Sequence, residues 1–203
     1  KLAACNTIEE ERNLLQAVLK LVLAAFVPLV CMMIAARGAM IELLYSPAFS
    51  DAALIIRWML AADLLKVAGF VFAMPLLARG HSRLFLASEL LWYGLFWIGI
   101  WMVRDAGSAL PEHIGIAYLV SYAGYWLFVA VYVPRLRSYG PHLRTNYLLC
   151  LCAAMPVALA IALSWHATMH IDWMRSALSV VPALVFSAAV LRPWRLISLK
   201  NRS

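Results

Sequence analysis

Residues 56–77 read IRWMLAADLLKVAGFVFAMPLL. At about 1.5 Å per residue, a helix of this length crosses the ~30 Å hydrocarbon core of a bilayer. Its middle nevertheless holds two charged residues, Asp63 and Lys66. The stretch therefore predicts a membrane-spanning helix whose central charges need a physical explanation.

The composition places the whole chain among integral membrane proteins. Of its 203 residues, 65% are apolar and 13% are charged, with a mean hydropathy of +0.84, whereas soluble globular chains are about half apolar and a quarter charged. Apolar runs that could span a membrane lie at residues 17–36, 56–77, 84–103, 114–133, 146–165 and 176–191. The expected fold class is all-α, a polytopic membrane bundle of about six transmembrane helices.

The connections between these runs are short, so we expect one polytopic domain with three parts. Residues 1–16 form a cytoplasmic amphipathic lead-in, residues 17–133 contain four spans, and residues 134–203 contain two additional spans and a basic cytoplasmic tail. The chain opens on a charged stretch and is expected to have no targeting peptide. We interpret it as the C-terminal part of a longer protein.

Thr7 and Glu10 match a capping box, which predicts a helix from residue 8 that continues into the first span. The helix dipole favours the glutamates of its first turn, Glu9, Glu10 and Glu11. We expect them to form a solvated charged face.

The net charge of +7 is distributed as the positive-inside bias of membrane proteins predicts. The N-terminal segment and alternate loops carry eleven basic residues, Lys1, Arg12, Arg79, Arg83, Arg135, Arg137, Arg144, Arg192, Arg195, Lys200 and Arg202. The opposite loops carry four, Arg37, Arg57, Arg104 and Arg175. Both termini are therefore expected to be cytoplasmic, and a membrane explains the positive charge better than a nucleic acid does.

Lys66 lies about 15 Å from either end of its span, too deep to reach the interface comfortably. Asp63, three positions earlier, is about 60° away on the same helix face. Two interpretations remain open: a buried pair that neutralises itself, or two side chains lining a hydrated cavity in which Lys66 attracts an anionic group. Arg57 projects from the opposite face, and we expect it to meet lipid headgroups.

Other polar and aromatic residues lie within the spans. Glu89, about 7 Å into the third span, is expected to contact Arg83 or Arg79 or to line the mouth of a cavity. Tyr118, Ser121, Tyr122 and Tyr125 form one polar face of the fourth span. These hydroxyls either bond between helices or form a wall suited to a sugar ring. Some of the tryptophans of the third span, Trp92, Trp97 and Trp101, are expected to face lipid.

Glycines in the spans permit close approach of helices, as membrane helix pairs often require. They are Gly69, Gly94, Gly99, Gly115 and Gly124. Cys150 and Cys152 have no second ligand pair nearby, and the His166/His170 pair lacks a third ligand. We therefore expect neither a metal site nor a cofactor, and the sequence has no catalytic motif.

The run from Met40 to Val129, nearly half of the chain, resembles the C-terminal half of the flippases for O-antigen and enterobacterial common antigen. These belong to the MOP exporter superfamily, which includes the MATE drug exporters. The resemblance is carried by I41-E42-L43-L44-Y45-S46-P47-A48-F49, A62-D63-L64-L65-K66-V67-A68-G69-F70, P75-L76-L77-A78-R79-G80, F85-L86-A87-S88-E89-L90, G115-I116-A117-Y118 and S121-Y122.

This resemblance implies that the chain is a transporter and not an enzyme. Its substrate would be an undecaprenyl-pyrophosphate-linked oligosaccharide, moved from the inner to the outer leaflet of the bacterial inner membrane for O-antigen and surface polysaccharide biosynthesis. Two six-helix lobes would alternate access around a cationic cavity, with the last two spans as accessory helices. The implied partners are this lipid-linked glycan, the bilayer and other polysaccharide-assembly proteins, with no nucleic acid.

On this basis the cavity residues would be Lys66, Asp63, Tyr118, Tyr122 and Tyr125. Lys66 would lie on the pyrophosphate path, and Asp63 would tune its charge. Glu89 and Asp63 would couple transport to an ion. Two alternatives stay open: a MATE-like cation or drug antiporter, which prefers acidic cavity residues, and a membrane enzyme of surface-glycan assembly such as a polymerase, ligase or acyltransferase.

Overall fold

The computed structural model describes residues 7–45, 49, 51–105, 111–137, 143–165 and 173–200, with backbone alone for residues 8, 133–137, 143–145, 147, 165, 173–177, 179 and 193–200. Regular structure in these ranges consists of six α-helices and no strand, which confirms the all-α prediction. They are α1 (Ile8–Leu44), α2 (Ala52–Ala78), α3 (Ser82–Asp105), α4 (Pro111–Arg137), α5 (Leu143–Trp165) and α6 (Trp173–Lys200).

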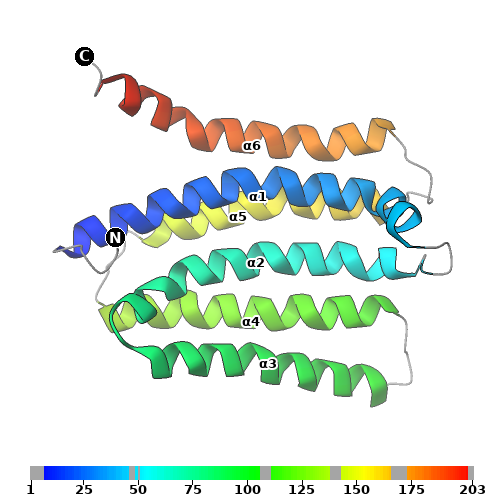
Figure 1. Ribbon diagram of the computed structural model, residues 1–203, viewed down its shortest axis with the longest axis horizontal. Helices are drawn as coiled ribbons and strands as arrows, with labels where there is room; N and C mark the ends of the chain where they lie inside the picture. Colours follow the sequence, from blue (N-terminus) through cyan, green and yellow to red (C-terminus); the bar gives the residue numbers. More distant parts are fainter. Residues whose placement is uncertain are drawn as a thin grey trace.

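Successive helices run antiparallel (Figure 1). The helices α3, α4, α2 and α1 follow one another across the bundle, and α5 and α6 pack against α1. The most extensive interface joins α2 to α4, so α2 lies between α1 and α4. We call the end where α1 begins and α2 ends the Arg79 end, and the opposite end, where α2 and α4 begin, the Glu112 end.

Each of the six expected spans lies within one helix. Four helices are long and apolar enough to cross a membrane, at Glu9–Leu44, Ala52–Ala78, Ser82–Asp105 and Pro111–Tyr132. The apolar stretches described in α5 and α6, Leu148–Ser164 and Val180–Arg192, are shorter. The chain thus has the helices of a membrane protein, while six spans and a two-lobe exporter architecture remain predictions.

The core forms where α1, α2, α4 and α5 meet. In α1, Leu23, Val27 and Ile34 have no exposed surface and recur at helical spacing. The edge helix α3 exposes Trp97 and Trp101 at 56% and 66%, as expected of lipid-facing tryptophans. In hydrocarbon a helix satisfies its own backbone polar groups, so apolar side chains can cover its outer faces.

Helix ends follow from local sequence. The Glu10 amide donates to Thr7 Oγ1 at 3.2 Å, which confirms Thr7 as the cap of α1. At the Arg79 end Gly80 has φ 77°, and the amides of Gly80 and His81 donate back to the Leu77 and Leu76 carbonyls. This Schellman turn requires the left-handed conformation that glycine adopts most readily.

Close approach of α2 and α4 depends on two glycines. A Cβ on Gly69 would lie 2.6 Å from a ring carbon of Tyr125, and one on Gly115 would lie 2.9 Å from the Ile55 carbonyl oxygen. The expected role of glycine in helix approach is confirmed there and also at Gly99 and Gly124. It is wrong for Gly94, which has no neighbouring atom within 4 Å.

Candidate functional site

The two charged residues in the middle of α2, Asp63 and Lys66, are both half-buried and face α4. Lys66 Nζ lies 5.4 Å from the centroid of the Tyr122 ring, a cation–π contact. Asp63 instead lies near the Tyr118 hydroxyl. No ion pair within 4.0 Å joins Asp63 to Lys66, but the Lys66 charge acts on the Asp63 carboxylate, so both interpretations of these two residues stay open.

The polar face of α4 points into the bundle, as its spacing predicts. Tyr122 and Tyr125 are 2% and 1% exposed, and Tyr118 is half-buried. Edge-to-face contacts link Tyr118 to Tyr122 at 4.8 Å and Tyr122 to Tyr125 at 6.2 Å between ring centroids. The Ser121 hydroxyl donates to the Tyr118 carbonyl of its own helix. Three tyrosines therefore present a continuous aromatic surface to α2 and α3.

Helix α3 completes this aromatic surface with Trp92. The Trp92 ring stacks on the Tyr122 ring, with 4.9 Å between ring centroids and an interplanar angle of 19°. The same Tyr122 ring also contacts Lys66. Phe96 meets Tyr118 edge-to-face at 5.7 Å. Sequence reasoning assigned neither ring to the site, although Trp92 lies three residues after Glu89 and therefore on the same helix face.

Glu89 has a different partner from the one expected. Its Oε2 accepts a hydrogen bond of 2.9 Å from Trp92 Nε1, so the expected contact with Arg83 or Arg79 is wrong. Its other oxygen, Oε1, is buried and has no hydrogen-bond partner among the described residues, and the same holds for the Tyr125 hydroxyl. The two side chains lie near each other, and Ser88 is close by. The Glu89 carboxylate thus lies among the aromatic side chains of α3 and α4.

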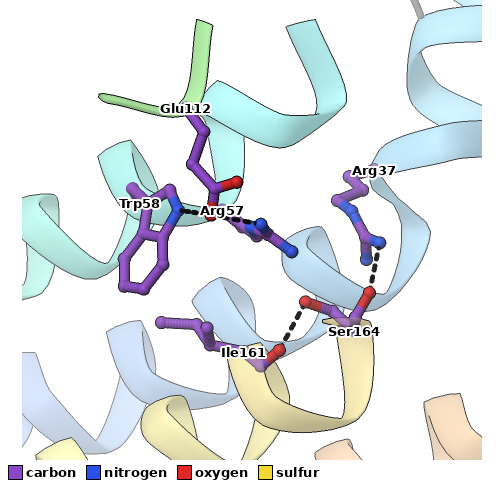
Figure 2. A network of polar contacts seen from close by, with 6 residues as sticks. All are labelled: Arg37, Arg57, Trp58, Glu112, Ile161 and Ser164. Atoms are coloured by element: carbon purple, nitrogen blue, oxygen red, sulfur yellow. Dashed lines mark hydrogen bonds and ion pairs between the residues drawn. The ribbon is translucent and has the colours of Figure 1, made fainter. Parts of the chain in front are cut away.

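A second polar cluster lies at the Glu112 end (Figure 2). Arg57 is 3% exposed and pairs with Glu112, so the expected lipid-headgroup position of Arg57 is wrong. The same carboxylate oxygen accepts the Trp58 indole N–H at 2.9 Å. Since α4 begins at Pro111, its first turn carries the carboxylate that neutralises the buried guanidinium of α2.

Arg37 of α1 belongs to this second cluster and is 9% exposed. Its guanidinium donates to the Ile34 carbonyl at 2.9 Å and to the Ser164 carbonyl of α5 at 2.8 Å. Ser164 lies in the last turn of α5, where carbonyls have no partner within the helix. Arg37 therefore caps α5 and ties it to α1.

A third polar contact lies at the Arg79 end. Glu11 has no exposed side-chain surface and pairs with Arg79 at 2.9 Å. The expectation that Glu11 belongs to a solvated face is therefore wrong, whereas Glu9 is 76% exposed. The pair joins the first turns of α1 to the end of α2, so ion pairs hold α2 at both of its ends.

Within the described parts of the chain, no three His, Cys, Asp or Glu side chains lie together as a metal site would require. The predicted His166/His170 pair lies outside the described residues. Comparison with protein-family models, with curated proteins and with solved structures found no match.

The structure brings all six predicted site residues into one cluster, which we call the aromatic cluster. Its members come from α2, α3 and α4, and they are Asp63, Lys66, Glu89, Trp92, Phe96, Tyr118, Tyr122 and Tyr125. The cluster joins one cation and two carboxylates to stacked rings and hydroxyls. Neighbouring side chains cover Tyr122 and Tyr125, so the groups that a ligand could reach are the half-buried ones, Asp63, Lys66, Glu89 and Tyr118. They could attract an anion at Lys66, a cation at Glu89 or a sugar ring at Tyr118.

Proposed function

We propose that the chain is part of a flippase that moves an undecaprenyl-pyrophosphate-linked oligosaccharide across the bacterial inner membrane by alternating access. Both termini of the chain would face the cytoplasm, and the aromatic cluster would line the path of the headgroup. In this proposal the protein catalyses no chemical step. Its partners are the lipid-linked glycan, the bilayer and other polysaccharide-assembly proteins.

One observation carries this proposal: Lys66 lies mid-helix with its ammonium over an aromatic ring and has no carboxylate partner within ion-pair distance among the described residues. A lysine neutralised by Asp63 would have little attraction left for a ligand. In a site of low dielectric, an ammonium without a direct ion pair stays attractive to a pyrophosphate.

The tyrosines and Trp92 support the glycan part of the proposal. Flat rings bury the apolar faces of a ligand while hydroxyls remain available as hydrogen-bond partners. The half-buried Tyr118 hydroxyl near Asp63 suits a polyhydroxylated substrate. Glu89 and Asp63 would couple transport to an ion, because their charges lie beside the rings that the substrate would contact.

A MATE-like antiporter for organic cations is the second candidate, and the Glu89 environment favours it. A buried carboxylate beside Trp92 and Tyr125 is the kind of site that attracts a cation to aromatic faces. Lys66 argues against this candidate, because its ammonium already occupies one face of Tyr122 and repels a second cation.

The test is complementation of a flippase-deficient bacterium with a compatible surface glycan by the gene of the intact protein and by its Lys66→Ala variant. The matched control is Lys20→Ala, because Lys20 is also half-buried but belongs to α1, outside the aromatic cluster. Surface glycan and the lipid-linked precursor held inside the cell are measured together with the amount of protein in the membrane.

We expect the parent and Lys20→Ala to restore surface glycan and Lys66→Ala to leave precursor inside the cell. Equal restoration by both variants at equal expression would remove Lys66 from the anion path. Failure of the parent with several glycans, together with resistance to organic cations in the same cells, would favour the antiporter.

A further inference from the structure

The second polar cluster at the Glu112 end buries two positive charges. Arg37 and Arg57 are 9% and 3% exposed, come from different helices, and both lie outside the aromatic cluster. Removing a guanidinium from water is costly unless an opposite charge or a full set of hydrogen bonds replaces the water. The groups next to each arginine therefore decide whether the positive charges of the cluster are neutralised.

The charges of this cluster do not balance within the described residues. The one carboxylate at these arginines, that of Glu112, pairs with Arg57 and also accepts the Trp58 indole N–H. Arg37 has two backbone carbonyls as acceptors and no described carboxylate within ion-pair distance. The C-terminal dipole of α5 contributes about half a negative charge. A positive excess remains buried.

The two guanidinium groups also repel each other. Figure 2 shows the Arg57 guanidinium extending away from Trp58 toward the side on which Arg37 lies, and the Arg57 charge acts on Arg37. Two like charges near each other in a buried site are stabilised when an anion binds between them. Arg37 has donors left for such an anion, because its guanidinium has five N–H groups and the Ile34 and Ser164 carbonyls accept only two of them.

We propose that Arg37 and Arg57 form a binding site for one phosphate-class oxyanion at the Glu112 end of the bundle. Guanidinium forks match the oxygen spacing of phosphate. The positive dipole end of α4 lies at the same end of the bundle, because Glu112 belongs to the first turn of α4. The phosphate belongs either to an anionic lipid headgroup at the membrane interface or to a soluble phosphate compound. This site does not depend on the proposed transport function.

The test measures binding to the intact purified protein with two probes. One is phosphatidylglycerol, whose bound copies are counted by native mass spectrometry against phosphatidylcholine. The other is inorganic pyrophosphate, whose binding is read from the shift in thermal unfolding against sodium chloride at equal ionic strength. Binding of the lipid alone identifies a headgroup site, and binding of pyrophosphate identifies a site open to soluble phosphate.

Three variants are compared with the parent. Arg37→Gln removes the charge and keeps a polar side chain, and we expect affinity for the bound probe to fall at least about ten-fold. Arg104→Gln removes an exposed arginine in the last turn of α3 and should leave affinity unchanged. Glu112→Gln removes the competing carboxylate and should tighten binding about three-fold or more.

A purely structural role for the arginines gives a different result. It predicts that neither probe binds, or that binding is the same in Arg37→Gln and Arg104→Gln, and either outcome overturns the proposal. Where Arg37→Gln does not fold, Glu112→Gln decides: tighter binding supports the site, and unchanged or weaker binding overturns it.

Discussion

The contact between Gly69 and Tyr125 determines how closely α2 approaches α4, and Gly69→Ala tests it. A Cβ at position 69 would lie 2.6 Å from Tyr125 Cε1 and 3.0 Å from Cδ1, where ordinary contacts begin at 3.4 Å. The Tyr125 ring is 1% exposed and packs against Phe70 and Tyr122, so it cannot move aside without displacing them. Overpacking of this kind costs about 1–3 kcal/mol.

A matched variant separates this cost from the helix propensity of alanine. Gly94→Ala adds the same methyl group where no atom lies within 4 Å, and replacing glycine by alanine in a helix gains about 1 kcal/mol. Because both variants share this gain, Gly69→Ala should be about 1–3 kcal/mol less stable than Gly94→Ala. The free energy of unfolding is measured by titrating detergent micelles with dodecyl sulfate and following helicity by circular dichroism.

A double-mutant cycle tests the cause. In a Tyr125→Leu background the ring is absent, so Gly69→Ala should lose most of its cost, giving a coupling energy of about 1 kcal/mol or more. Gly69→Ala as stable as Gly94→Ala would refute the close contact between α2 and α4. An undiminished cost in the Tyr125→Leu background would refute Tyr125 as its cause.

Three further substitutions test other contacts by the same unfolding measurement. Gly80→Ala should cost about 1–2 kcal/mol, because φ 77° is strained for a residue with a Cβ; no loss would contradict the Schellman turn. Glu11→Ala should cost about 1–3 kcal/mol, since it removes a buried partner of the arginine at the end of α2. Glu9→Ala, at an exposed pair of 3.7 Å, should cost under about 1 kcal/mol, and equal losses would place Glu11 in solvent. Trp92→Phe keeps the stacked ring but removes the donor to Glu89, and we expect a loss of about 1–3 kcal/mol; a neutral result would exclude that hydrogen bond.

The sequence alone determined the class of protein and the positions of its helices. Apolar runs of this length suit helices that cross lipid, where the backbone must satisfy its own hydrogen bonds. Each expected span does lie within one helix. The Thr7 cap followed from local spacing, as did the inward face of Tyr118, Tyr122 and Tyr125. These features depend on residues within a few turns of each other, which the sequence places directly. The roles of the site residues in transport stay predictions.

The tertiary structure decided where the charged side chains go. Arg57 was expected in headgroups and pairs with Glu112, Glu11 was expected in solvent and pairs with Arg79, and Glu89 binds Trp92. The helix α2 has apolar residues on every face, so periodicity does not say which face meets lipid and which meets protein. That choice depends on which helices lie on either side of α2. It is fixed by contacts between residues that are far apart in the sequence: Arg57 and Glu112 are separated by 55 positions, and Glu11 and Arg79 by 68.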